Sequence, residues 1–171
     1  MSEILFWIFA GVAVIAAFMC ITRRSPVASA LWLVQTLFAL AAIFVILDAQ
    51  FIAALQVLVY AGAIMVLFLF VIMLLNLGGQ GPRDMAGIPG RVISAVGGAL
   101  LIVELITVNK LLPDELIRLP EGTLAQMAEA QGVVGLIAEP LFRGFLVPFE
   151  VTSVLLLAAV VGAVVLAKRR I

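Results

Sequence analysis

The chain has 171 residues, of which 65% are hydrophobic and only 12% are charged, and its mean hydropathy is +1.32. Soluble domains carry about 25% charged residues, so this composition predicts an integral membrane protein without a separate soluble domain. Ten basic and ten acidic residues cancel, which argues against nucleic-acid binding, and the absence of histidine and the single cysteine argue against zinc, haem and iron–sulfur sites.

Five apolar stretches are long enough to cross a hydrocarbon core of roughly 30 Å as helices that rise about 1.5 Å per residue. They cover about residues 4–22, 28–47, 52–77, 92–112 and 149–167. The sequence therefore predicts an all-α fold with five transmembrane helices in a single membrane domain, residues 1–171. Only a few residues join the second and third spans, so we expect these two to form a tight antiparallel pair.

Basic residues near the span ends predict the orientation, because cytoplasmic loops carry an excess of Lys and Arg. If the N-terminus lies outside and the C-terminus inside (N-out/C-in), seven of the ten basic residues fall on the inner side. These are Arg23, Arg24, Arg83, Arg91, Lys168, Arg169 and Arg170. Most acidic residues then fall outside, which favours the same arrangement.

The long connection, residues 113–148, is expected on the outer side. A short helix near 124–131 is predicted, and Gly132 is its expected stop. Residues 133–147 are rich in apolar side chains but too short to span the bilayer, and Pro140 and Pro148 interrupt them. We expect this stretch to lie on the membrane surface or on a partner.

The third span contains polar and small residues that an ordinary membrane anchor does not need. In an α-helix, Gln56, Tyr60 and Ala63 would lie on one face, at positions i, i+4 and i+7. Gly62 lowers helix propensity by about 1 kcal/mol relative to Ala, so a π-bulge or local distortion is predicted here. The alternative is ordinary hydrogen bonding between helices, which contributes roughly 0.6 kcal/mol per bond in membranes.

Glu104 is the main electrostatic feature of the fourth span. It lies ~18 Å along the predicted helix, near the middle of the membrane, where a carboxylate costs about 3 kcal/mol. We interpret it as a proton-relay carboxylate or the partner of a basic group on another subunit, and Gln56 as a further polar group of such a path. The alternative is an uncharged or snorkelling carboxyl group that faces a lateral groove.

Two blocks of sequence resemble a known family. Residues 55–75 read LQVLVYAGAIMVLFLFVIMLL, and residues 146–157 read LVPFEVTSVLLL. The first block resembles the third span of subunit J of bacterial NADH:quinone oxidoreductase (respiratory complex I), and the second resembles the entry of that family into its fifth span. The chain length, the five spans and the N-out orientation agree with this resemblance.

The resemblance implies a membrane-arm subunit that binds no redox cofactor, whereas NADH, FMN, iron–sulfur clusters and quinone belong to the parent complex. It implies a π-bulge around Tyr60, Gly62, Met65 and Val66, next to Ala63, whose conversion to a regular α-helix is linked to the coupling of quinone reduction to proton translocation. The expected partners are other membrane-arm subunits in a hetero-oligomer and the lipid bilayer. No family role is carried onto Glu104.

Two other assignments stay open at this point. The chain can be the related subunit of a multisubunit cation/proton antiporter or membrane-bound hydrogenase, or it can be a purely structural assembly subunit. Neighbouring genes would distinguish the first alternative from complex I, since they would encode either antiporter subunits or quinone-reductase subunits. Point changes that leave proton pumping intact would favour the second alternative. The absence of an organelle presequence favours a bacterial plasma (inner) membrane.

Overall fold

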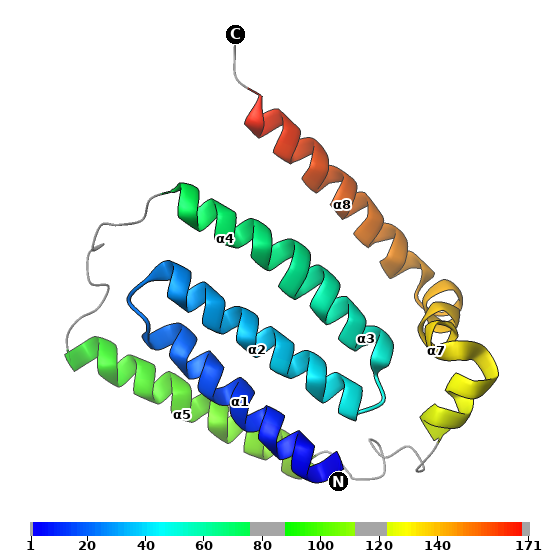
Figure 1. The fold of residues 1–171 in the computed structure, drawn as a ribbon, viewed down its shortest axis with the longest axis horizontal. Coiled ribbons are helices and arrows are strands. Elements are labelled where there is room, and N and C mark those ends of the chain that lie inside the picture. The colour runs from blue at the N-terminus through cyan, green and yellow to red at the C-terminus, as the bar shows by residue number, and fades with distance from the viewer. Residues whose placement is uncertain (1, 76–87, 112–122, 169–171) are drawn as a thin grey trace. The chain divides into compact units, whose positions relative to one another are not determined.

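The computed structural model describes residues 2–75, 88–111 and 123–168, and all regular secondary structure within these ranges is helical (Figure 1). The all-α prediction is therefore confirmed for this part of the chain. The residues fall into two compact units, Met1–Glu121 and Gly122–Ile171, which are described separately. The prediction of a single membrane domain stays a prediction.

The first two helices form an antiparallel pair in which small residues meet. Helix α1 covers Ser2–Thr22 and α2 covers Pro26–Ile46. Ser25 ends the tight turn between them, since its side-chain oxygen accepts a hydrogen bond from the Ala28 N–H at 3.5 Å. Pro26 at the first helical position lacks only an N–H that would have no partner in the helix. The buried residues of α1 and α2 are all alanines, which allows the two backbones to approach closely.

The third span is one continuous helical stretch with three segments. These are α3 at Gln50–Leu55, the π-helix η1 at Gln56–Ile64 and α4 at Met65–Leu74. All three segments contact α2. The tight pairing of the second and third spans is therefore confirmed.

The turn between α2 and α3 is three residues long, and its centre is Asp48 with φ = 60°. The Asp48 N–H donates to the carbonyl of Val45 at 3.1 Å, and the Ala49 N–H donates to the carbonyl of Phe44 at 2.9 Å. These two bonds form a Schellman motif, in which the left-handed position is usually glycine. Asp48 therefore follows the end of α2 in a left-handed backbone conformation that closes this motif.

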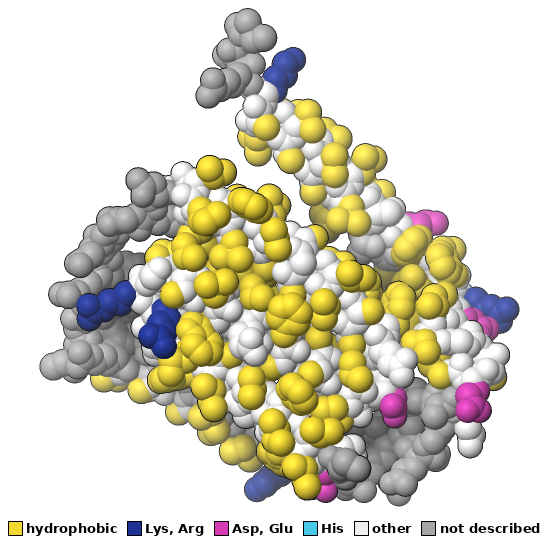
Figure 2. Space-filling model, viewed as in Figure 1, with side chains coloured by type: hydrophobic (Ala, Val, Ile, Leu, Met, Phe, Trp, Pro, Cys, Tyr) yellow, Lys and Arg dark blue, Asp and Glu magenta, His cyan; other side chains and the backbone are white. Residues whose placement is uncertain are grey.

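The core of this unit lies between α2 and α4. Ala30, Met65 and Ile72 are buried together, and Val27, Leu33, Val34, Leu37 and Leu69 pack around them. Most other large apolar side chains are exposed, and Figure 2 shows them spread over the visible face of α1, α2 and α4. Such an apolar exterior is expected of helices that face lipid or the helices of other subunits.

Helix α5, Ile88–Leu111, covers most of the predicted fourth span. Four other helical stretches are long and apolar enough to cross a membrane, namely Ser2–Thr22, Pro26–Ile46, Gln50–Leu74 and Leu146–Ala167. Within α5 the apolar part, Ser94–Val108, is shorter. The membrane-helical character is thus confirmed, and the five-span count and the N-out orientation stay predictions.

The second unit consists of α7, Thr123–Arg143, and α8, Leu146–Ala167. Gly132 interrupts α7 with φ = 76° and ψ = 157°, which confirms the predicted short helix that ends there. Beyond Gly132 the predicted interfacial stretch is helical as far as Arg143. The rings of Phe142 and Phe149 pack edge-to-face, with centroids 5.1 Å apart, and so join α7 to α8.

Candidate functional site in the third span

The distortion predicted in the third span is present as a nine-residue π-helix, Gln56–Ile64. At its end the Met65 N–H points to the carbonyl of Tyr60, five residues earlier, as well as to that of Gly62. The distortion is longer than a single-turn bulge and begins four residues before Tyr60. Met65 and Val66 were predicted within it, but they are the first two residues of α4.

Gly62 fits this segment because it has no side chain. A Cβ atom built at position 62 would lie 3.2 Å from the carbonyl oxygen of Val57. This separation is shorter than an ordinary van der Waals contact, so a larger residue would have to move that carbonyl. Helix propensity alone identifies Gly62. It does not identify Val57, because the two residues come close only at the five-residue spacing of a π-helix.

The side chains of the π-helix divide into a buried and an exposed group. Ala61 is 5% exposed, as is Met65 directly after the π-helix, which packs with Ala30 of α2, whereas 53% of Tyr60 is exposed. Gln56 is half-buried, and Ala63 and Val66 are exposed. The predicted common face of Gln56, Tyr60 and Ala63 assumed 3.6 residues per turn, and a π-helix does not have this spacing.

The polar groups of this segment have no partner within the described part of the chain. Neither the Tyr60 hydroxyl nor the Gln56 amide forms a hydrogen bond to another described residue. Leaving such groups unpaired in hydrocarbon costs free energy, so these two side chains favour contact with water or another polar group. The segment therefore presents hydrogen-bonding groups outward from the middle of an apolar span.

Glu104 lies in the apolar part of α5 with its side chain exposed. No described residue donates a hydrogen bond or ion pair to its carboxyl group, and the structure does not bring it into contact with the π-helix. One turn further along, the Thr107 hydroxyl donates to the carbonyl of Val103 at 2.7 Å, so this hydroxyl is satisfied within its own helix. Glu104 is thus an unpaired acidic side chain among the described residues of α5.

No group of three or more His, Cys, Asp or Glu side chains that could hold a metal ion forms within the described ranges. The absence of a cofactor in this chain stays a prediction.

The comparisons with known proteins give the family. A family model for NADH-ubiquinone/plastoquinone oxidoreductase chain 6 matches residues 16–166. The chain belongs to this family. The matched residues include the π-helix, α5 with Glu104 and nearly all of α8. The resemblance to subunit J that the sequence blocks indicated is therefore confirmed.

Individual relatives agree with the family model over nearly the whole chain. NADH-quinone oxidoreductase subunit J of Pseudomonas aeruginosa is 39% identical over 165 residues, which cover 94% of this chain and 93% of the relative. Subunit J of Rhodobacter capsulatus is 33% identical over 171 residues, covering 96% and 80%. NAD(P)H-quinone oxidoreductase chain 6 of a Synechocystis species is 36% identical over 164 residues, covering 96% and 79%.

Proposed function

We propose that this chain is a membrane-arm subunit of a proton-pumping NADH:quinone oxidoreductase, and that its third span couples quinone reduction to proton translocation. The observation that carries the coupling role is the π-helix Gln56–Ile64 in the middle of that span. NADH, FMN, the iron–sulfur clusters and the quinone are bound by other subunits of the complex. The chain then acts through its conformation and the hydration around it, not through redox chemistry of its own.

A π-helix can act as a switch because its α-helical alternative is close in free energy. Conversion of η1 to an α-helix changes the residues per turn and rotates the side chains on one side of the segment relative to the other. The exposed Tyr60 and half-buried Gln56 would then change the water or the partner that they contact. A two-state element of this kind is what a conformational coupling mechanism requires.

Glu104 is proposed as an auxiliary proton site. An ionisable side chain within a transmembrane segment is expensive and usually lines a proton path or a water-filled cavity. Support for this role comes from its exposed position in the apolar stretch Ser94–Val108 and from the lack of a partner among the described residues.

The N-out arrangement is supported by where charges fall on the first unit. Arg23 and Arg24 lie between α1 and α2, at one end of the helix pair, whereas Glu3 and Asp48 lie at the opposite end. By the positive-inside rule the arginine end faces the cytoplasm, and the membrane is the plasma membrane of a bacterium.

The names of the relatives favour a quinone oxidoreductase over an antiporter or a hydrogenase, since each of the three is named as a subunit or chain of a quinone oxidoreductase. The test is to solubilise membranes that contain the tagged chain and separate the complexes on a native gel. We expect the chain to migrate with a large band that stains for NADH dehydrogenase activity. A smaller band without flavin or iron–sulfur subunits would contradict the assignment.

A further inference from the structure

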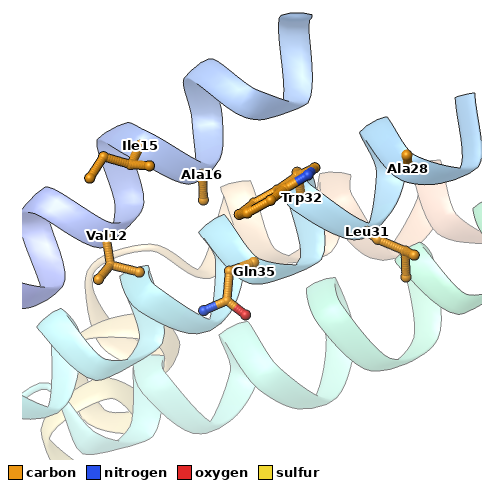
Figure 3. A pocket seen from close by; sticks show the side chains of 7 residues that line it. All are labelled: Val12, Ile15, Ala16, Ala28, Leu31, Trp32 and Gln35. Carbon is orange, nitrogen blue, oxygen red and sulfur yellow. The ribbon is translucent and has the colours of Figure 1, made fainter. Parts of the chain in front are cut away.

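A groove of about 580 Å³ lies open between α1 and α2 (Figure 3). Its volume is typical of ligand clefts, which are roughly 300–1,000 Å³. The side chains that line it are almost all apolar: Val12, Ile15 and Ala16 on α1, and Leu31, Trp32 and, as the polar exception, Gln35 on α2. The groove therefore suits an apolar chain along most of its length.

The groove is shorter than one leaflet of a bilayer and can lie within it. On α2 it extends from Ala28 to Gln35, which is about 10 Å at the rise of an α-helix. One leaflet supplies half of a hydrocarbon core of roughly 30 Å. The Ala28 end lies near the turn between α1 and α2, and Gln35 marks the inner limit of the apolar walls.

One basic side chain, Arg23, lies against a residue of this groove, and Arg24 follows it in the turn between α1 and α2. The Arg23 guanidinium carbon is 5.8 Å from the centre of the Trp32 ring, which itself lines the groove. Arg23 also donates to the sulfur of Met19 at 3.4 Å, a weak acceptor. Arg23 and Arg24 are both exposed, and among the described residues neither is paired with a carboxylate. Their positive charge is therefore available to an anion at the membrane surface.

The combination of apolar groove and basic end identifies the occupant. We propose that the groove between α1 and α2 binds an anionic phospholipid of the cytoplasmic leaflet, with an acyl chain against Ile15, Ala16 and Leu31 and its phosphate at Arg23 and Arg24. Guanidinium groups match phosphate oxygens in charge and geometry, and basic pockets between transmembrane helices bind anionic head groups.

The charge, and not the groove alone, provides the selectivity. An acyl chain in the groove exchanges contacts with other lipid tails for contacts with equally apolar side chains. This exchange gives little preference for one lipid over another. The two arginines distinguish a negatively charged head group from a zwitterionic one. Each is expected to change the affinity roughly five-fold, which corresponds to the electrostatic contribution of one basic residue near a membrane surface.

The test uses the tagged chain purified with its native partners and placed in phosphatidylcholine vesicles. The probe is phosphatidylglycerol with a photoreactive group in its acyl chain, compared with phosphatidylcholine that carries the same group. We expect peptides of α1 and α2 that contain Ile15 and Leu31 to be labelled several-fold more by the phosphatidylglycerol probe. Arg23→Gln and Arg24→Gln should each lower this labelling roughly five-fold.

Lys168→Gln is the matched control, because it removes one positive charge at the end of α8 and Lys168 is not a lining residue of the groove, so it should leave the labelling unchanged. Equal labelling by both probes, or labelling that ignores the arginines, would overturn the proposal. So would the absence of lipid labelling together with disulfide crosslinking of Leu31→Cys to a helix of another subunit. If an arginine variant does not assemble, competition on the unaltered protein decides: unlabelled phosphatidylglycerol should reduce labelling more than phosphatidylcholine, and equal competition would refute the site.

Discussion

Gly62 and Val57 lie so close in the π-helix that a Cβ atom on residue 62 would be 3.2 Å from the carbonyl oxygen of residue 57. The two residues are five positions apart, which is the hydrogen-bonding interval of a π-helix. The π-helical conformation therefore favours glycine at position 62, because any side chain there would crowd the Val57 carbonyl. This closeness also gives a way to shift that conformation with a single methyl group.

Gly62→Ala should move the segment towards the α-helix. Alanine increases α-helical propensity by about 1 kcal/mol and presses its Cβ against the Val57 carbonyl in the π-form. If the third span couples the two reactions, proton pumping per NADH oxidised should fall several-fold, while the amount of assembled complex and its NADH dehydrogenase staining stay near normal. Gly62→Leu should have a larger effect in the same direction. Both are measured by proton uptake into inverted membrane vesicles during NADH oxidation.

Gly11→Ala is the control for this change. It adds the same methyl group to a helix of the same unit, but no atom lies within 4 Å of the position that the Cβ would occupy. Pumping should stay unchanged in this variant. Loss of assembly in Gly62→Ala, with no separate defect in pumping, would indicate a structural and not a coupling role for the π-helix.

Asp48 provides a prediction about folding. Its φ of 60° suits glycine and, among other residues, Asn and Asp, whereas a β-branched side chain is strained there. Asp48→Val should cost about 1–2 kcal/mol and reduce the amount of complex that assembles, as judged on native gels. Asp48→Gly removes the same charge but fits the turn, so it should assemble at least as well as the natural sequence. Equal losses in both variants would mean that the carboxylate, and not the backbone, matters.

The sequence predicts the ends of the helices well where local chemistry determines them. Arg23 and Arg24 lie between the first two helices, and Gly132 interrupts α7, because charges and a left-handed glycine act over a few residues. Gly62 predicts a distortion of the helix at this place, but the sequence does not predict that the π-helix covers nine residues. Its start at Gln56 is not indicated by any residue pattern that the sequence analysis used.

The candidate site was harder to predict than the fold for a related reason. Reading Gln56, Tyr60 and Ala63 at α-helical spacing gave them a shared face that a π-helix does not provide. Met65 was expected within the distortion, yet it is a buried packing residue of α4. Glu104 can be recognised from its charge alone, and the described residues contain no partner for it.

Glu104→Gln tests the proposed proton site. The change keeps the shape and polarity of the side chain but removes its ability to ionise. If Glu104 relays protons, the number pumped per NADH should fall while NADH oxidation with an artificial electron acceptor continues. Glu150→Gln, at the beginning of α8, makes the same chemical change outside the proposed path and should leave pumping unaltered. An unchanged proton yield in Glu104→Gln would reject the relay.

Met65 and Met73 allow packing to be separated from coupling, since both lie on α4 and carry the same side chain. Met65 is 5% exposed and packs against Ala30 of α2, whereas Met73 is 57% exposed. Truncating a buried methionine typically costs about 2–5 kcal/mol, because contacts are lost and a cavity remains. Met65→Ala should therefore lower the amount of assembled complex and the temperature at which it dissociates, with a matching fall in NADH oxidation. Met73→Ala should change these quantities far less. If Met65→Ala assembles normally but pumps fewer protons, Met65 belongs to the switch itself and not only to the core that holds α4 in place.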